Sequence, residues 1–405
     1  ITTINNKHNK LNVPNLRFKE FQGEWEELGL SELLDFKNGL NPKPDKFGKG
    51  IKFISVMDIL NYAVITYDCI KASVDVTEKE LSDFSVEKGD ILFQRSSETL
   101  EDVGRANVYM DDKTAVFGGF VIRGKKKGEY DPQYFNYLLR SPFARKRIIP
   151  MGAGAQHFNI GQEGLSKVKL HFANIEEQKK IGKMLSLLDE RIATQNKIID
   201  KLQSLIKGIC NNYFEKLSVQ EKANLIRLSD VLKERNEYSS KDGKFIHGTL
   251  SKDGIFPKTG RWDRDFLVKQ EDKKYKVTHL DDICYNPANL KFGVICRNTF
   301  GDLIFSPIYV TFEVCKNVNI GFMELYLTNH NFIEKVRRFE QGTVYERMAV
   351  SPEDFLSYKI RIPSYSDQTF FYKKVQWLIT LSQNEMKLLS QYKKLRQYLL
   401  RQMFI

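Results

Sequence analysis

The residues best suited to chemistry in this 405-residue sequence are amide and basic side chains in short segments between apolar runs. Arginine and lysine neutralise phosphates, and arginine, asparagine and glutamine form paired hydrogen bonds to base edges in the major groove of DNA. In the first half of the chain, the candidates for such contacts are Gln94, Arg95, Arg105, Lys126, Gln156, His157 and Asn159.

The second half of the chain carries a set of the same kind. The segments Gln156–Asn159 and Tyr345–Arg347 follow a glycine at matching places, which favours direct contact with a partner. The run Lys125–Lys127 is equally typical of a solvated surface, so both interpretations stay open for Lys126. The candidates of the second half are Arg261, Arg264, Asn286, Asn289, Lys291, Tyr345 and Arg347.

No catalytic constellation accompanies these residues in the sequence. Tyr285–Asn289 half-resembles the Asn-Pro-Pro-aromatic loop that grips a target adenine, but it lacks the second proline and the aromatic residue. Gly152–Gly154 neither follows an expected strand nor opens an expected helix, so it is a poor nucleotide-binding loop. The six histidines show no metal-binding spacing. The sequence therefore predicts a recognition protein that is not an enzyme and has no cofactor of its own.

Composition supports a polyanionic partner. Lysine and arginine number 63 against 51 aspartates and glutamates, a formal charge of +12, which suits nucleic acid ahead of membrane. The length predicts two domains, or three. No apolar run is long enough to span a bilayer, and no secretory signal opens the sequence. The five cysteines are widely spaced, so we expect neither structural zinc nor disulfides, and a cytoplasmic location.

The chain contains an internal repeat. The acid–glutamine pairs Glu177-Gln178 and Asp367-Gln368 each open a long helical segment, and they lie 190 residues apart. The number of residues between matching positions increases towards the start of the chain. We therefore expect the insertions and deletions between the two copies to lie in the globular halves and not in the helices. Further matches pair Phe214 with Phe404 at 190, Gly89–Phe93 with Asp281–Tyr285 at 192, and Leu30–Leu33 with Leu228–Val231 at 198.

This repeat predicts the order half-domain, helix, half-domain, helix. Residues 1–13 are expected to form a flexible tail. The other expected boundaries are 14–175 for the first recognition domain, 176–217 for the first helix, 218–365 for the second domain and 366–405 for the second helix.

The first long helix carries an apolar stripe with a period of 3.5 residues, which is typical of a coiled coil. The second helix repeats this stripe less cleanly, with polar residues at three of its positions, so its stripe broadens or shifts. We expect the two helices to pair antiparallel and to hold the two halves at opposite ends. The alternative is that each helix packs on its own domain. The stripe of the first helix contains Ile181, Leu185, Leu188, Ile192, Gln195, Ile199, Leu202, Ile206, Ile209 and Tyr213; that of the second contains Phe371, Val375, Leu378, Ser382, Glu385, Leu389, Tyr392, Arg396, Leu399 and Met403.

Each globular half is expected to be α+β. Helices are predicted at 134–148 in the first copy and at 321–338 in the second. Short runs bounded by glycine, asparagine and aspartate predict strands at 51–56, 90–93, 106–109 and 115–117, and at 282–285, 294–296 and 308–312.

In this order, the motifs resemble the specificity subunit of type I restriction–modification enzymes, and the resemblance covers nearly the whole chain. Pro14–Phe18 with Trp25 looks like that family's opening, and Ile362-Pro363 before Asp367-Gln368 resembles its entry into a long helix. Other matching segments are Lys88–Phe93 with Arg95, Gly104-Arg105, and Tyr285 through Gly293. The first copy departs from the family at His171–Ala173, where proline is usual.

The resemblance implies two target-recognition domains that each read one half of a split, asymmetric DNA sequence. It implies two methyltransferase subunits bound to this chain, and restriction subunits that join through them. S-adenosylmethionine, ATP and magnesium are expected on those partners. Two other functions stay open from the residues alone, namely a stand-alone DNA adenine methyltransferase and a coiled-coil protein that binds RNA or acts as a scaffold.

Overall fold

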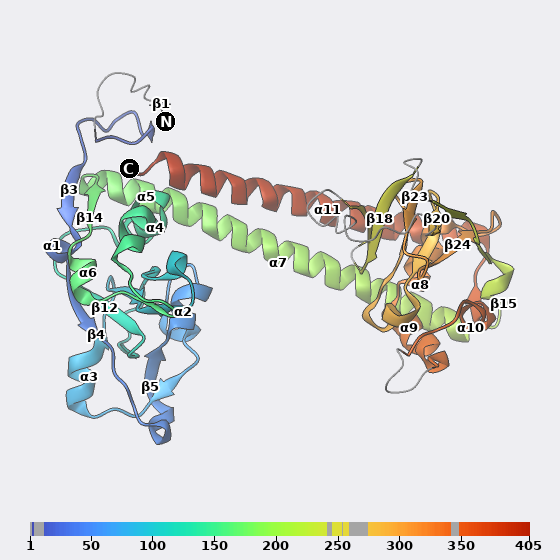
Figure 1. The fold of residues 1–405 in the computed structure, drawn as a ribbon, viewed down its shortest axis with the longest axis horizontal. Coiled ribbons are helices and arrows are strands. Elements are labelled where there is room, and N and C mark those ends of the chain that lie inside the picture. Colours follow the sequence, from blue (N-terminus) through green and yellow to red (C-terminus); the bar gives the residue numbers. More distant parts are fainter. Residues whose placement is uncertain (1, 4–11, 241–244, 253, 259–273, 342–347) are drawn as a thin grey trace. The chain divides into compact units, whose positions relative to one another are not determined.

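The computed structural model describes residues 2–3, 12–240, 245–252, 254–258, 274–341 and 348–405. The chain forms two compact units (Figure 1). Unit 1 comprises residues 1–197 and 387–405, and unit 2 comprises residues 198–386.

The main sheet of unit 1 is antiparallel, with the strand order β10-β8-β12-β4. Ile91 and Phe93 of β8 pack into one apolar core with the helix α4 (Pro132–Arg140), while Leu92 between them faces a second core. Successive side chains of a strand point to opposite faces, so an uninterrupted apolar run indicates that both faces are covered. The strands are β4 (Leu34–Asn38), β8 (Ile91–Gln94), β10 (Ala106–Val108) and β12 (Val121–Lys126).

A second sheet of unit 1 has the order β6-β5-β11-β7, and its central pair β5/β11 is parallel. The predicted strand at 51–56 is wrong at its end. Ser55 caps helix α2, since its backbone N–H and its hydroxyl both donate to Asp58, at 2.7 Å each. The elements are β5 (Phe47–Ile54), α2 (Val56–Asn61), β6 (Ser73–Val74), β7 (Ser85–Val86) and β11 (Ala115–Phe117).

Unit 2 repeats both sheets. Its antiparallel sheet has the order β22-β21-β24-β16, and its second sheet has the order β19-β18-β23-β20-β17 with a parallel central pair β18/β23. Strand for strand this is the arrangement of unit 1 with β17 added, so the predicted α+β duplication is confirmed. The strands are β16 (Leu232–Glu234), β17 (Tyr238–Ser239), β18 (Ile246–Ser251), β19 (Gly254–Pro257), β20 (Tyr275–Thr278), β21 (Ile283–Tyr285), β22 (Ile295–Arg297), β23 (Leu303–Phe305) and β24 (Val310–Val314).

A two-stranded antiparallel ribbon closes each unit. In unit 1, β3 (Glu26–Gly29) pairs with β14 (Lys169–Phe172). In unit 2, β15 (Asn224–Arg227) pairs with β25 (Lys359–Ile362). The second strand of each ribbon directly precedes a long helix, so the chain leaves each set of sheets beside the point where it entered.

Both single helices predicted in the globular halves are wrong, because each is two helices. Ser141 ends α4 (Pro132–Arg140) and caps α5 (Pro142–Ile148) with its hydroxyl, which accepts from the Ala144 N–H at 3.2 Å. Proline is tolerated in the first turn of a helix but not in its interior, so Pro142 starts a new helix. In unit 2, Asn329 likewise separates α8 (Ile320–Leu327) from α9 (His330–Val336).

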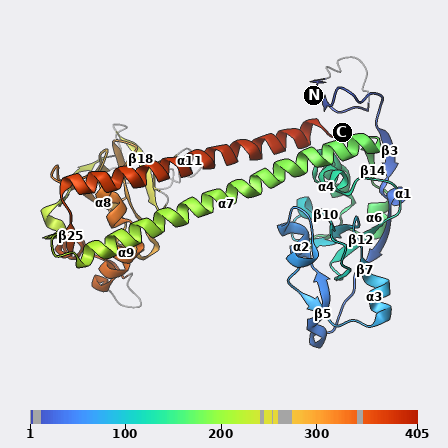
Figure 2. The same cartoon turned by 180° about the vertical axis from the view of Figure 1, so that it is seen from behind.

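The two long helices are α7 (Ile175–Val219) and α11 (Tyr365–Gln402). Every residue of the two predicted stripes is buried or half-buried. In unit 1, Arg396 of α11 pairs with Asp189 of α7 at 2.6 Å. In unit 2, the rings of Tyr213 of α7 and Phe371 of α11 stack at 3.7 Å. The helices therefore run side by side and antiparallel within each unit (Figure 2).

The repeated glutamine joins each long helix to its unit. Gln178 accepts a hydrogen bond from the Asp131 N–H at 3.0 Å and donates to the Ala173 carbonyl at 2.8 Å. Gln368 accepts from the Asn319 N–H at 2.9 Å and donates to the Pro363 carbonyl at 3.0 Å. Asp131 and Asn319 are the N-caps of α4 and α8. The glutamine of the acid–glutamine motif therefore has a structural role in both units, because it links the start of a long helix to the start of a short one.

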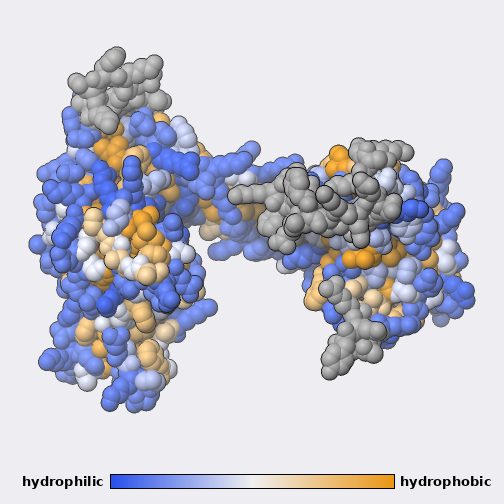
Figure 3. All heavy atoms as spheres, viewed as in Figure 1, coloured by the Kyte–Doolittle hydropathy of each residue, from blue (hydrophilic) through white to orange (hydrophobic). Residues whose placement is uncertain are grey.

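All five cysteines are free thiols. No helix among the described residues is long and apolar enough to cross a membrane. On the face drawn in Figure 3, the described residues are mainly hydrophilic, with scattered apolar patches. The remaining elements are β1 (Thr2–Thr3), β2 (Leu16–Arg17), β9 (Ser96–Ser97), β13 (Phe158–Asn159), α1 (Leu30–Leu33), α3 (Glu78–Phe84), α6 (Gln162–Ser166) and α10 (Pro352–Ser357).

Candidate nucleic-acid interface

Two segments of unit 1 that are distant in sequence form one polar loop surface. Ser96 and Asn159 are partners in the short antiparallel pair β9/β13, and the Ser96 hydroxyl donates to the Asn159 side chain. The backbone N–H of Ile160 donates to the Arg95 carbonyl at 2.9 Å. Gln156 and His157, just before β13, are exposed. The structure therefore brings together Arg95, Gln156, His157 and Asn159, which the sequence places in separate candidate loops.

Gln94 and Arg105 lie at the same end of the main sheet but differ in accessibility. The Gln94 N–H donates to the Arg105 carbonyl at 2.7 Å, which places the two residues opposite each other. Gln94 is only 5% exposed, and its side-chain amide donates to the Ser96 carbonyl at 2.8 Å. Arg105 is exposed and pairs with Asp102 at 2.5 Å. In this conformation Gln94 supports the loop from inside, and Arg105 is available to a partner.

Lys126 lies away from this loop surface. Strand β12 pairs with β8 so that Val121 is opposite Gln94, and Lys126 is at the far end of β12. At about 3.3 Å per residue the two ends are about 16 Å apart. The Lys126 ammonium donates to the Tyr130 carbonyl at 3.1 Å and lies 4.8 Å from the centre of the Tyr130 ring. The structure thus separates Lys126 from the other candidates of unit 1.

The loop surface also contains Phe120, which the sequence analysis did not single out. Phe120 is 68% exposed and follows Gly118-Gly119 between β11 and β12. The Arg95 N–H donates to the Phe120 carbonyl at 2.9 Å, and the Arg95 guanidinium donates to the Gly119 carbonyl at 3.3 Å. An aromatic ring held outward beside basic groups can contact a base or a thymine methyl group. The Gly-Gly-Phe turn between two apolar strands was the signal for it.

In unit 2, a short 3-10 helix, η7 (Pro287–Phe292), presents the corresponding loop. Asn286 is 7% exposed and caps this helix through the Ala288 N–H at 3.1 Å, while Asn289 is half-buried. Lys291 and Phe292 are exposed, with the ammonium 5.2 Å from the ring centre. The structure therefore places Asn286 inside the turn and Lys291 outside, next to an aromatic ring that sequence reasoning passed over.

Four candidates of the second half, Arg261, Arg264, Tyr345 and Arg347, lie outside the described residues.

A buried carboxylate supports each antiparallel sheet at the end opposite to the loop surface. Asp90 accepts from the backbone N–H groups of Glu87 at 3.0 Å and Lys126 at 2.9 Å, and burial raises its pKa. Asp282, at the matching position of unit 2, accepts from the His279 N–H at 2.8 Å and forms a two-pronged pair with Arg235 at 2.9 and 3.0 Å. The aspartate of this motif is therefore structural in both copies.

Residues 22–204 match a family model described as the type I restriction modification DNA specificity domain. A protein of Methanocaldococcus jannaschii named as the specificity subunit of the type I restriction enzyme MjaX is 28% identical over 202 residues, which cover 49% of this chain and 47% of that protein. The type I restriction enzyme EcoKI specificity subunit of Escherichia coli is 25% identical over 138 residues, which cover 34% of this chain and 28% of that subunit. The chain thus spans less than half the length of these curated relatives.

Two solved structures share the fold. The type I restriction–modification system S subunit from M. genitalium aligns with a TM-score of 0.60 at 18% identity, and the alignment covers 97% of this chain and 99% of that one. A chain from a structural study of complex assembly in the type I R-M system aligns with a TM-score of 0.55 at 12% identity and covers 93% and 96%. By these matches the chain is similar to type I restriction–modification specificity subunits, in sequence over about half of its length and in fold over nearly all of it.

Proposed function

We propose that this chain is the DNA-reading subunit of a type I restriction–modification complex and that each of its two units reads one half of a split DNA target. The observation that carries the proposal is the duplication of both sheets, each copy with an exposed loop at the same end of its antiparallel sheet. Two different loops on one repeated scaffold suit an asymmetric target in two parts.

The residue chemistry of the loops supports DNA as the ligand. Arg95, Arg105 and Lys291 supply positive charge, while Gln156 and Asn159 supply amides that can pair with base edges. We assign the phosphate contacts chiefly to the basic groups and base reading chiefly to the amides.

The same proposal includes the partners. The methyl transfer and the cleavage are carried out by methyltransferase and restriction subunits, which bind S-adenosylmethionine, ATP and magnesium. This chain supplies recognition and no catalytic group. We propose two methyltransferase subunits, one for each half of the target.

An exchange of one unit's sheets tests the proposal. Residues 224–362 run from the first strand of the unit 2 ribbon to the second, so they can be replaced by the matching segment of a relative with a different target. Genome-wide adenine methylation is then sequenced in cells that carry the methyltransferase partner. We expect one half of the methylated motif to change and the other half to persist.

The reciprocal exchange of residues 26–172 is the matched control, and it should change the other half. If either exchange changes both halves of the methylated motif, or changes neither half, the assignment of one half-site to each unit is contradicted.

A single substitution tests the loop surface of unit 1. Asn159→Ala should lower discrimination at one position of one half-site by about 1–3 kcal/mol, because a paired contact to a base is lost. The measurement is competition binding against a panel of duplexes that differ at single positions. A uniform loss over the whole panel would assign Asn159 to the backbone instead.

A further inference from the structure

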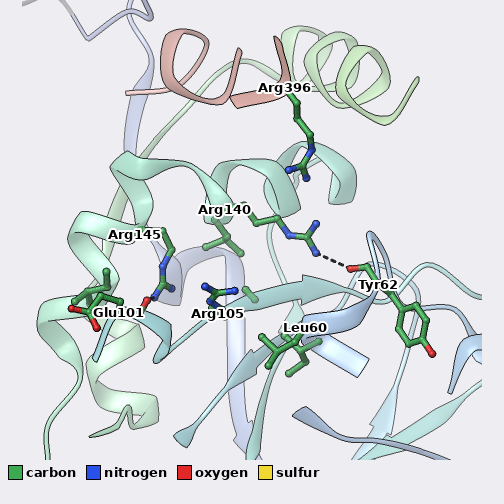
Figure 4. Close-up of a pocket in the computed structure, with 11 residues that line it drawn as sticks. Leu60, Tyr62, Glu101, Arg105, Arg140, Arg145 and Arg396 are labelled. Atoms are coloured by element: carbon green, nitrogen blue, oxygen red, sulfur yellow. Dashed lines mark hydrogen bonds between the residues drawn. The ribbon is translucent and has the colours of Figure 1, made fainter. Parts of the chain in front are cut away.

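Unit 1 contains an arginine-lined pocket that none of the assignments above uses. It has a volume of about 420 Å³ and lies between helix α2, the loop before β10, helices α4 and α5, and helix α11. Four guanidinium groups line it, from Arg105, Arg140, Arg145 and Arg396, and Figure 4 shows these four side chains around one space. The one carboxylate that lines it is that of Glu101.

Two of the four arginines are balanced by carboxylates. Arg396 pairs with Asp189 at 2.6 Å, and Asp189 also accepts from the Tyr137 hydroxyl at 2.9 Å. Arg105 pairs with Asp102 at 2.5 Å. These carboxylates fix the direction of two guanidinium groups while they offset the charge of each.

The other two arginines have no carboxylate partner among the described residues. Arg140 donates one hydrogen bond, to the Tyr62 carbonyl at 3.3 Å, although a guanidinium has five N–H donors (Figure 4). Arg145 donates to the carbonyls of Gly104, Glu101 and Val103 at 2.6 to 2.9 Å. Neither arginine therefore has a direct ion pair among the described residues, although the charge of Asp189 acts on Arg140 and that of Asp102 acts on Arg145.

Electrostatics indicates that this arrangement favours an anion. Burial lowers the pKa of Arg140 to about 10, and the charge of Arg396 lowers it further. Burial likewise lowers the pKa of Arg145 to about 10, with the charge of Arg105 acting in the same direction. Like charges held together in a partly desolvated space repel, and a bound dianion removes that repulsion. Arginine also matches phosphate oxygens with two parallel hydrogen bonds.

We propose that this pocket is a phosphate-binding site, with Arg140 as its main free donor. The phosphate belongs either to the DNA backbone or to a free phosphate ion. The first source rests on the proposed function, and it is favoured because Arg105 is shared between the pocket and the loop surface at Gln94 to Ser97. The second source requires no DNA at all.

Substitution of Glu101 should change phosphate affinity in the opposite direction to substitution of an arginine. Its carboxylate lines the pocket, forms no ion pair with the described residues, and repels a bound phosphate. Glu101→Gln should therefore strengthen binding, whereas Arg140→Gln should weaken it by about tenfold or more through the loss of a charge-assisted donor. Lys146→Gln is the matched control, because Lys146 is an exposed cation of α5 that does not line the pocket.

The experiment measures two ligands on the full-length chain and these three variants. Inorganic phosphate is titrated by calorimetry in a phosphate-free buffer. A target duplex, with the methyltransferase partner present, is titrated over a range of salt concentrations. A backbone phosphate in the pocket predicts that Arg140→Gln lowers the slope of log affinity against log salt by about one. A free-phosphate site predicts loss of calorimetric binding with an unchanged slope.

The proposal is overturned if neither ligand responds to Arg140→Gln and Glu101→Gln, or if Lys146→Gln has an equal effect. If Arg140→Gln does not fold, Glu101→Gln still decides: a phosphate in the pocket predicts tighter binding of inorganic phosphate or of the duplex, and unchanged binding of both overturns the proposal. The methylated motif should be the same in all three variants. If the phosphate site is disproved, the result of the domain-exchange experiment is therefore unaffected. If the domain-exchange experiment contradicts the proposed function, the calorimetric measurement of phosphate binding still tests the pocket by itself.

Discussion

Asp90 and Asp282 occupy the same turn in the two units, but they are satisfied in different ways. Asp90 accepts from two backbone N–H groups, whereas Asp282 holds the guanidinium of Arg235. At the preceding position, Gly89 has a φ of 97° and Asp281 has a φ of 75°. A left-handed backbone suits glycine, so the aspartate at 281 is strained in a way that its partner in unit 1 is not. The Asp281 carboxylate also accepts a hydrogen bond from the Arg297 guanidinium at 2.8 Å.

Removal of the Asp282 carboxylate should destabilise unit 2 strongly. Asp282→Ala leaves Arg235 without its two-pronged partner and the His279 N–H without an acceptor, so we expect a loss of about 3 kcal/mol in the free energy of unfolding. Denaturant unfolding measures it. Glu313→Ala is the control, since the Glu313 carboxylate is exposed and 3.6 Å from Arg235, and its loss should cost under about 1 kcal/mol. Equal losses would refute the structural role of Asp282.

His279 makes the stability of unit 2 depend on pH. Partial burial lowers its pKa, but hydrogen bonds to Glu237 and Asp302 at 3.0 and 2.8 Å outweigh burial and raise its pKa above 6.5. The protonated ring thus stabilises the fold below about pH 6.5, and this contribution disappears as pH rises through the raised pKa. His279→Gln should destabilise the protein at about pH 6 and have a much smaller effect at about pH 9.

His171 in unit 1 is the internal comparison for this pH effect. Burial, together with the charge of Arg147, lowers its pKa, so the neutral ring is the stabilising form. The stability that it contributes is therefore lost as pH falls through 6.5 and below. Thermal unfolding of His171→Gln and His279→Gln over pH should give opposite trends. Parallel trends would show that general surface charge, and not these two rings, sets the pH dependence.

At the level of elements, each long helix packs closely on a short helix of its unit, α7 on α4 and α11 on α8, at a position where one partner has a glycine. A side chain added at Gly182 of α7 would lie 2.6 Å from the Asp131 carboxylate and 2.9 Å from the Tyr134 nitrogen. In unit 2 the matching helix position is Tyr372, and there the small residue is Gly321 of α8, which faces the tyrosine ring. Each close contact between a long and a short helix requires one glycine. In unit 1 the glycine is on the long helix, and in unit 2 it is on the short helix.

Gly182→Ala should therefore destabilise unit 1 by about 1–3 kcal/mol, because the new methyl group overlaps backbone that cannot move away easily. Gly208→Ala in the same helix is the control. Nothing lies within 4 Å of the added carbon at Gly208, so alanine should stabilise the helix by up to about 1 kcal/mol. Differential scanning calorimetry distinguishes the signs, and stabilisation by both substitutions would rule out the close contact at Gly182.

The elements that the sequence predicted well are those with a strong period. The buried stripe of α7 was predicted correctly, including its polar member Gln195, which is 1% exposed. The breaks at Ser141 and Asn329 were missed, because the apolar periodicity continues across both and only the capping chemistry marks the boundary. The loop candidates were placed by residue type alone. The residue type alone does not distinguish Gln94, which points inward, from Asn159, which is exposed. This difference depends on the strand with which each loop pairs.

For the molecule as a whole, residues near the end of the sequence complete the core of the unit that the beginning forms. Phe404 is 1% exposed, with its ring centre 5.5 Å from that of Tyr134 and 6.4 Å from that of Trp25. Phe214, 190 residues earlier, is buried in unit 2 against Phe322 and Tyr326. The two phenylalanines are therefore equivalent core residues, Phe404 in unit 1 and Phe214 in unit 2.

Phe404→Ala should therefore lower the protection of unit 1 amides, and Phe214→Ala that of unit 2 amides. Each loss should be about 3–5 kcal/mol, as for other buried phenylalanines. Hydrogen exchange followed by mass spectrometry resolves the two regions in one measurement. If either substitution exposed both units equally, the two cores would be a single cooperative block.

The paired ribbons β3/β14 and β15/β25 have an evolutionary consequence. Since the sheets of each unit begin and end on neighbouring hydrogen-bonded strands, the intervening segment behaves as a cassette. Recombination within these few residues could install a foreign reading head while the spacing of the helices stays the same. Under the proposed function, new specificities would arise by exchange of whole modules as well as by point changes in the loops.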